Sequence, residues 1–174
     1  MNTPNKLTLL RVVLIPVFLV VLYIGFPHAN LVAMGIFIVA SLTDFLDGYL
    51  ARKNNIVTDF GKFMDPLADK VLVFAAMMWF VELGIMPAWA VLIVSVREFA
   101  VTALRLIAVG DGVVIAAGKS GKVKTATTMV CLVAMFLALP QWANWLGTGL
   151  IVATTLYSGI EYFVVNKRLL DWTK

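Results

Sequence analysis

Long apolar runs alternate with short polar breaks along this chain, and this alternation is its dominant pattern. Each run is close to the ~20 residues that an α-helix needs to cross the hydrocarbon core of a bilayer. The pattern therefore predicts an all-α, polytopic membrane protein with six transmembrane helices joined by short connections. The predicted spans are Leu7–Phe26, Leu31–Lys53, Phe63–Leu83, Pro87–Ala108, Lys122–Leu139 and Trp145–Val165.

The short connections leave no room for a second folded domain, so we expect one membrane domain over residues 1–174. Composition supports this, because 61% of the residues are hydrophobic and only 14% are charged. The first apolar run is long for a signal peptide and no small-residue cleavage site follows it, so we expect it to remain as a helix. Cys131 is the single cysteine, which excludes an internal disulfide and makes it a filler of apolar space.

Basic residues mark alternate ends of the predicted spans, and the opposite connections, Phe26–Asn30, Glu82–Met86 and Pro140–Asn144, contain no Lys or Arg. Cytoplasmic loops are enriched in these residues, so both termini are expected in the cytoplasm. The net charge of +4 then lies on the face that meets anionic lipid, so lipid rather than nucleic acid is the expected partner. The tryptophans expected to anchor the outer ends are Trp79, Trp89, Trp142 and Trp145.

Four aspartates interrupt the cytoplasmic halves of the second and third spans. Asp44 and Asp47 are one helical turn apart, as are Asp65 and Asp69, so each pair shares a helix face. An ionisable group at membrane depth costs roughly 2.5–3.5 kcal/mol on insertion scales and usually serves a function. Clustered carboxylates need cations, and their hard oxygen atoms suit Mg²⁺ or Mn²⁺ rather than zinc. Two such ions can clamp the attacking and leaving oxygens of a displacement at phosphorus.

Cationic side chains occur at the same depth on later spans. The expected orientation puts Arg97 at mid-depth, Arg105 nearer the cytoplasm, and Lys119 and Lys122 at the entrance to the fifth span. All of these groups can line one cavity open to the cytoplasmic leaflet, where Arg and Lys bind phosphates that the metals do not reach. The alternatives are that the two lysines only orient the chain and that Arg97 pairs with Glu98.

Beside the first aspartate pair, small residues leave the helix backbone uncovered by large side chains. Gly48 and Ala51 lie one turn apart, so a flat ligand can approach the backbone there, although small residues also serve helix packing.

Two further charged residues, Lys70 and Glu161, can each be interpreted in more than one way. Lys70 either binds phosphate or balances the acidic cluster, and Glu161 is expected to pair with a cation.

The aspartates belong to a longer pattern, which reads Asp44-x-x-Asp47-Gly48-x-x-Ala51-Arg52, eight residues, Gly61-x-x-x-Asp65-x-x-x-Asp69. This pattern resembles the full signature of the CDP-alcohol phosphotransferases, and no position departs from it. Its eight fixed identities make it specific within its 26 residues, and the six-helix layout extends the resemblance to the whole chain. Less specific stretches that resemble the bacterial phosphatidylglycerophosphate synthases are residues 5–11, 97–105 and 118–125.

The resemblance implies a two-metal centre beside a nucleotide site. Its metal ligands would be Asp44, Asp47, Asp65 and Asp69, and Asp69 would also remove the proton from the acceptor hydroxyl. The residues that would contact the nucleotide are Asn5, Thr8, Gly48, Ala51, Arg52 and Gly61, with Arg52 on the diphosphate.

The reaction implied by the resemblance is phosphatidyl transfer from CDP-diacylglycerol to sn-glycerol 3-phosphate, which gives phosphatidylglycerophosphate and CMP. An acceptor that carries a phosphate needs a cationic pocket, and the residues that can supply it are Arg97, Arg105, Lys119 and Lys122. A homodimer is implied by the resemblance alone.

Three other functions stay open. One is a sister enzyme with inositol phosphate, serine or phosphatidylglycerol as acceptor. Another is a divalent-cation transporter, which would give no role to Gly48, Ala51, Arg52 and Gly61. The third is a structural subunit whose acids pair with its cations, although such pairing would disperse the acids rather than cluster them on two helices.

Overall fold

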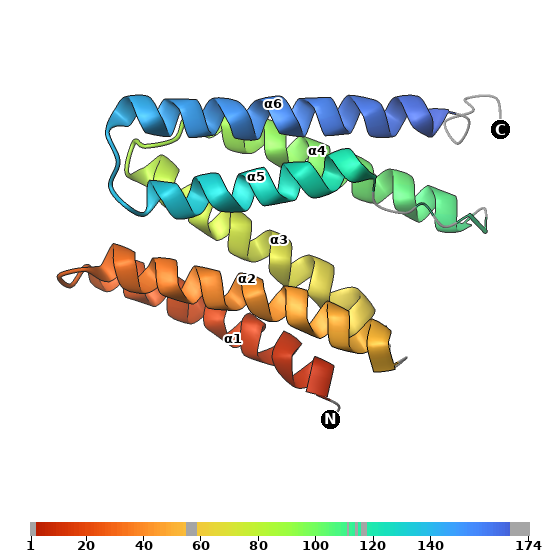
Figure 1. Cartoon of the computed structure of the whole chain (residues 1–174), viewed down its shortest axis with the longest axis horizontal. Helices are drawn as coiled ribbons and strands as arrows, with labels where there is room; N and C mark the ends of the chain where they lie inside the picture. The colour runs from red at the N-terminus through yellow and green to blue at the C-terminus, as the bar shows by residue number, and fades with distance from the viewer. Residues whose placement is uncertain (1–2, 55–58, 111, 114, 116–117, 168–174) are drawn as a thin grey trace. The chain divides into compact units, whose positions relative to one another are not determined.

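The computed structural model describes the backbone of residues 3–54, 59–110, 112–113, 115 and 118–167, and side chains from residue 9 except those of 44–63 and 65–66. Within these residues the chain forms six α-helices and no strand (Figure 1). This confirms the all-α prediction. The helices are α1 (Thr3–Ile24), α2 (Ala29–Asn54), α3 (Asp59–Glu82), α4 (Ala88–Gly110), α5 (Lys119–Met135) and α6 (Gln141–Val165).

The helices follow the predicted spans to within four residues, and two of the four-residue differences lie on either side of Pro140. α6 begins at Gln141, four residues before the predicted Trp145, because a proline at a helix start has no N–H to leave unpaired. α5 ends at Met135 rather than at Leu139: Ala138 has a positive φ of 53°, and Leu139 precedes a proline, so neither residue continues the helix. The prediction from apolar content alone therefore placed the connection between α5 and α6 about one helical turn too far along the chain.

Two compact units make up the chain: Met1–Trp79 with Phe136–Ala138, and Phe80–Met135 with Leu139–Lys174. The first unit contains α1, α2 and most of α3, and therefore the whole aspartate signature. The second contains α4, α5 and α6, which carry the basic residues Arg97, Arg105, Lys119 and Lys122.

Aromatic rings form the centre of the first unit, where α1 packs along α2. Phe18, Phe37 and Phe136 meet there with centroid separations of 6.3, 6.0 and 6.1 Å. Each such pair adds about 0.5–1.5 kcal/mol beyond the burial of its area. Ala33 and Ala40 are fully buried between these helices, and their small side chains permit the close packing.

Arg11 is fully buried in the first unit, although a basic residue near a predicted helix end normally faces water. Its Nε donates a hydrogen bond to the carbonyl oxygen of Ala40 at 3.3 Å. Ala40 lies one turn before Asp44, so this buried cation ties α1 to α2 next to the aspartate signature. A charge without water needs such partners.

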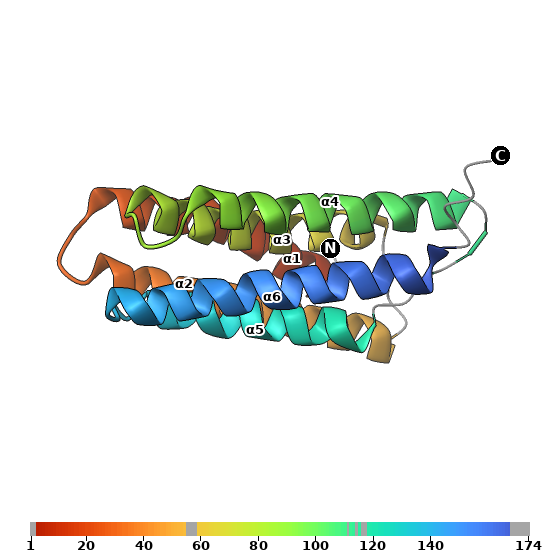
Figure 2. The same cartoon turned by 90° about the horizontal axis from the view of Figure 1, so that it is seen from above.

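In the second unit, α6 packs against both α5 and α4 (Figures 1 and 2). A Cβ atom at Gly147 would lie 3.1 Å from Met135 Cε and 3.6 Å from Cys131 Cβ, so the lack of a side chain at this position favours the close approach of α5. Cys131 is a buried free thiol, as predicted. Small residues commonly serve helix packing in this way.

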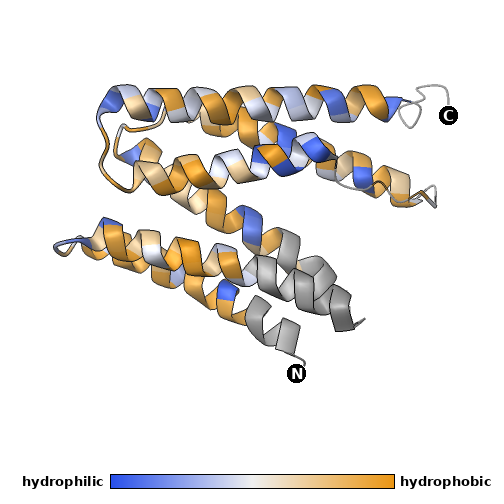
Figure 3. Cartoon of the chain, in the orientation of Figure 1, coloured by the Kyte–Doolittle hydropathy of each residue, from blue (hydrophilic) through white to orange (hydrophobic). Residues whose placement is uncertain are grey.

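α6, with 25 residues, is the one helix within the described part of the chain that is long and apolar enough to cross a membrane. α4 has 23 residues but carries Arg97, Glu98 and Arg105, and α5 has only 17 and begins with Lys119. Figure 3 shows apolar colour along most of the helices, with polar colour at the start of α5 and in places along α4. The charges that interrupt these helices are those of the candidate site.

Candidate active site

The aspartate signature lies on two continuous helices. α2 runs through Asp44 and Asp47, and α3 runs through Asp65 and Asp69. The backbone therefore has the helical spacing that puts each pair one turn apart on one face. The side chain of Asp69 is partly buried, and so is that of Lys70.

The other residues of the signature and of the nucleotide site lie outside the side chains that the structure describes: Asn5, Thr8, Asp44, Asp47, Gly48, Ala51, Arg52, Gly61 and Asp65. Among the described side chains, no three of Asp, Glu, His and Cys gather into a metal-binding group. Since only Asp69 of the four aspartates belongs to that part, the metal centre stays a prediction.

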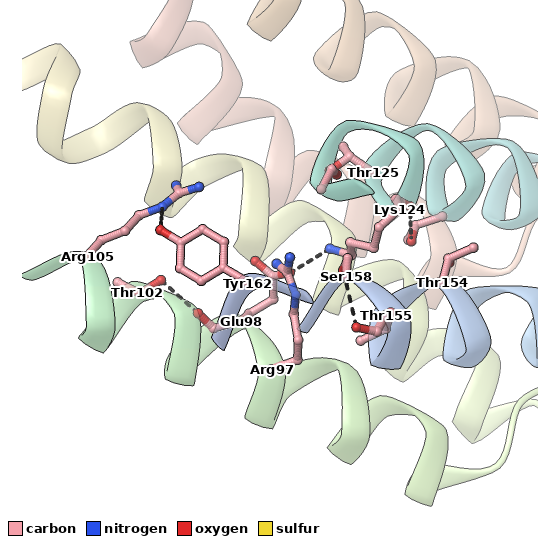
Figure 4. A network of polar contacts seen from close by, with 12 residues as sticks. Arg97, Glu98, Thr102, Arg105, Lys124, Thr125, Thr154, Thr155, Ser158 and Tyr162 are labelled. Carbon is pink, nitrogen blue, oxygen red and sulfur yellow. Dashed lines mark hydrogen bonds and ion pairs between the residues drawn. The ribbon is translucent and has the colours of Figure 1, made fainter. Parts of the chain in front are cut away.

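Three charged side chains of the second unit form what we call the Glu98 cluster (Figure 4). Arg97 Nη1 donates to Glu98 Oε1 at 2.9 Å, and Lys124 Nζ donates to the same oxygen at 2.6 Å. The side chains of Arg97, Glu98 and Lys124 are only 12%, 14% and 9% exposed. The pairing of Arg97 with Glu98 that the sequence allowed is confirmed, and Lys124 joins it.

Among the side chains that the structure describes, two cations of the Glu98 cluster share one carboxylate, which leaves one positive charge in excess there. An unbalanced charge is costly to bury, so the cluster favours an anion that completes it. Arg97 Nε is also buried, and no described residue forms a hydrogen bond with it. Guanidinium groups bind phosphate and carboxylate with well-aligned N–H donors. The cluster therefore has the charge and the spare donor of an anion site.

Arg105 lies two turns after Arg97 on α4 and is held by Tyr162 of α6 (Figure 4). Its Nε donates to the Tyr162 hydroxyl at 3.0 Å, and its Cζ lies 5.5 Å from the ring centroid, within cation–π range. The side chain of Arg105 is exposed while that of Tyr162 is buried. A fixed guanidinium thus presents its remaining N–H groups to solvent or ligand.

Lys119 and Lys122 are exposed at the start of α5. Lys119 lines a groove of about 490 Å³ between α5 and α6. The other residues that line it are Ser120, Val123, Ala153, Thr154, Tyr157 and Glu161. Glu161 forms no ion pair with any described residue, so its expected pairing is not formed there. Its carboxylate makes the groove less favourable to a phosphate than the Glu98 cluster.

Lys124 is the candidate residue that the sequence interpretation missed. It is buried in α5 together with Thr128, Cys131 and Met135, which follow it at helical spacing. These positions define the inner face of the helix. This spacing could have identified Lys124 as a buried residue of α5. The prediction chose Lys119 and Lys122 instead, because it considered their position at the start of the span and not the helix face on which each lysine lies.

The sequence matches the family CDP-alcohol phosphatidyltransferase over residues 1–157, and the chain belongs to this family. It is 44% identical to a CDP-diacylglycerol–glycerol-3-phosphate 3-phosphatidyltransferase of Bacillus subtilis (strain 168), over 95% of each protein. It is 40% identical to a protein with the same description from Salmonella paratyphi A, over 92% of each. A probable phosphatidylglycerophosphate synthase of Mycobacterium tuberculosis (strain H37Rv) is 39% identical over 92% of this chain and 79% of the relative.

Proposed function

We propose that this protein transfers the phosphatidyl group of CDP-diacylglycerol to sn-glycerol 3-phosphate, with phosphatidylglycerophosphate and CMP as products. Its family and the activity named for its relatives at 40% and 44% identity support this step of anionic phospholipid synthesis. The structural observation that carries the choice of acceptor is the Glu98 cluster, in which the described side chains give two cations to one carboxylate and no described group bonds to Arg97 Nε.

A phosphorylated acceptor suits the chemistry of the second unit. A phosphate dianion can balance the Glu98 cluster and accept hydrogen bonds from Arg97 and Arg105, whereas serine or glycerol carries no phosphate for these donors. Lys119 and Lys122 are exposed, so we assign them a smaller part, which is to raise the positive potential that attracts the acceptor.

The donor would bind at the aspartate signature in the first unit. Arg52 would contact its diphosphate, and the residues that would contact the nucleotide are Asn5, Thr8, Gly48, Ala51 and Gly61. A cavity open to the cytoplasmic leaflet is part of the proposal.

Two divalent cations, Mg²⁺ or Mn²⁺, would be held by Asp44, Asp47, Asp65 and Asp69. The donor set fits hard cations, because each helix presents two carboxylates one turn apart and no His or Cys lies in either segment. When bound, such ions would stabilise negative charge on the diphosphate and on the departing CMP.

The chemical step would be a displacement at the phosphorus that bears diacylglycerol. Asp69 accepts the proton of the acceptor hydroxyl, and the oxygen of that hydroxyl forms the new bond to phosphorus. The bond from phosphorus to the CMP oxygen breaks, and CMP leaves with the electron pair. Arg97 and Arg105 hold the acceptor phosphate and so orient its hydroxyl toward the donor.

We propose that all six helices span the membrane, with both termini and the active site on the cytoplasmic side. Many large apolar side chains are exposed, including Leu106 at 69%, Val130 at 69% and Ile160 at 65%, as a lipid-facing surface requires. Trp89 and Trp142 are also exposed near the outer ends, where such rings anchor at the interface. A homodimer is proposed on family resemblance alone.

An acceptor panel tests the proposed function against the sister-enzyme alternative. CMP release from CDP-diacylglycerol is measured with glycerol 3-phosphate, inositol phosphate, serine and phosphatidylglycerol. We expect glycerol 3-phosphate to be preferred over serine by about tenfold or more in kcat/KM, because a site built to bind a polar group rejects analogues without it. We expect it to be preferred over inositol phosphate and phosphatidylglycerol as well, since glycerol 3-phosphate is the acceptor named for the relatives. Preference for any other acceptor would overturn the assignment.

Removal of a cationic side chain from the acceptor site should raise the KM for glycerol 3-phosphate and leave that for CDP-diacylglycerol unchanged. We expect Arg105→Ala to raise the KM for glycerol 3-phosphate about 5- to 20-fold, since it loses a charge-assisted hydrogen bond that is partly screened by solvent. Lys119→Ala should give a smaller rise in the same KM. Steady-state kinetics with each substrate varied in turn provide the measurement.

Lys167→Ala is the control, because it removes an exposed lysine from outside the proposed site. We expect both of its KM values to stay within about twofold of wild type. If Arg105→Ala raised the KM for CDP-diacylglycerol to the same extent, the assignment of Arg105 to the acceptor phosphate would be wrong.

A further inference from the structure

Two residues of α6, Gly159 and Tyr162, pack against the arginines of the proposed acceptor site. They lie three residues apart on one face of α6, and both are buried. They also lie beyond residue 157, where the family match ends. No catalytic motif of the sequence includes them.

Gly159 provides the space for the Arg97 side chain. A Cβ atom at position 159 would lie 3.1 Å from Arg97 Cγ, which is closer than ordinary van der Waals contact. Cγ is near the root of the side chain, so displacing it moves the whole guanidinium. Arg97 Nη1 is bonded to Glu98, and hence such a displacement would disturb the Glu98 cluster as well.

Tyr162 fixes Arg105 in two ways. Its hydroxyl accepts the hydrogen bond from Arg105 Nε, and its ring lies beside the guanidinium (Figure 4). Tyr162 is itself immobilised, since it is 8% exposed and packs with Val101 and Leu104 of α4. An exposed, otherwise mobile arginine is therefore attached to a rigid part of the fold.

We propose that Gly159 and Tyr162 are positioning residues that set the spacing between the guanidinium groups of Arg97 and Arg105. That spacing determines which phosphorylated alcohol the site accepts, because both arginines must reach one phosphomonoester while its hydroxyl faces the donor. This inference rests on the proposed function. It assigns acceptor selectivity to the last turns of α6, which need not touch the substrate.

Two variants test the inference. Gly159→Ala should raise the KM for glycerol 3-phosphate about tenfold through the displaced Arg97, and Tyr162→Phe about 3- to 10-fold through the lost hydroxyl. The KM for CDP-diacylglycerol and kcat at saturating acceptor should change by less than about twofold. Selectivity for glycerol 3-phosphate over inositol phosphate, measured as a ratio of kcat/KM values, should fall in both variants.

Matched controls lie on the same helix. Gly149→Ala adds a methyl group where no atom lies within 4 Å, and Thr148→Val removes a hydroxyl that bonds only to the carbonyl of Asn144. Both should keep the wild-type KM values and selectivity. If kcat fell and both KM values rose together in Tyr162→Phe, or if nothing changed, the positioning role would be wrong.

Calorimetric binding of glycerol 3-phosphate without donor separates this inference from the proposed function. Weaker binding in both variants, with wild-type binding in both controls, supports the positioning role even if the enzyme released no CMP. Absence of CMP release with every acceptor would overturn the proposed function alone. Equal affinity for glycerol 3-phosphate in the wild type and in both variants would overturn the positioning role alone.

Discussion

We expect Asp69→Asn to slow the chemical step by about 10²- to 10⁴-fold while CDP-diacylglycerol still binds. Asparagine keeps a side-chain oxygen at a partly buried position of α3 but cannot accept the proton of the acceptor hydroxyl. The two functions assigned to Asp69, metal ligand and general base, are therefore separated by this one substitution.

The measurement is single-turnover CMP release beside equilibrium binding of CDP-diacylglycerol. Glu82→Gln is the matched control, because it converts an exposed acid at the other end of α3 to an amide. It should keep the wild-type rate within about twofold. Loss of donor binding in Asp69→Asn with an unchanged chemical rate would make Asp69 a ligand only, and the base would lie elsewhere.

Chelation of divalent cations should abolish turnover, and added Mg²⁺ or Mn²⁺ should restore it. Asp44→Asn and Asp65→Asn should each require a higher metal concentration for half-maximal activity, because the affinity of such a site depends on the charge of its ligands. The expected shift is about tenfold or more, as each variant replaces a charged ligand by a neutral one.

The measurement is CMP release across a titration of Mg²⁺ after treatment with EDTA. Glu82→Gln again serves as the control and should give the wild-type titration curve. Near-normal turnover in EDTA would exclude the two-metal hypothesis. So would wild-type metal dependence in both aspartate variants.

The helices of this chain were largely predictable, because apolar runs of spanning length and proline-marked breaks are local features of the sequence. Even the correction at Pro140 follows from the conformational preferences of proline and its neighbours. The helical course of α2 and α3 through the aspartate signature was predictable for the same reason, and it supports the one-turn spacing of both pairs.

The contacts of the basic residues were harder to predict. Arg105 and Tyr162 are 57 positions apart, and their hydrogen bond depends on how α4 packs against α6. Periodicity reports which face of a helix is buried but not which helix covers it. The partnership of Glu98 with Lys124 and the space at Gly159 are interhelical features of the same kind.

Functional charges also make it harder to recognise, from hydropathy, that the helices that carry them are membrane spans. α4 contains Arg97, Glu98 and Arg105 within 23 residues, so its length suits a membrane span but its apolar content is interrupted. The Glu98 cluster explains in part how α4 can carry these charges, because Arg97 and Glu98 form an ion pair inside the second unit. Hydropathy is a poorer guide for a helix whose ionisable groups pair with neighbours.

One measurement tests phosphatidyl transfer to glycerol 3-phosphate most directly. Glycerol 3-phosphate labelled with ¹⁸O in the acceptor hydroxyl is incubated with the protein, CDP-diacylglycerol and Mg²⁺, and both products are analysed by mass spectrometry. We expect labelled phosphatidylglycerophosphate and unlabelled CMP in equal amounts, because the acceptor oxygen attacks the phosphorus that bears diacylglycerol. Phosphatidic acid as the lipid product, or CMP formed without phosphatidylglycerophosphate, would contradict the proposed reaction.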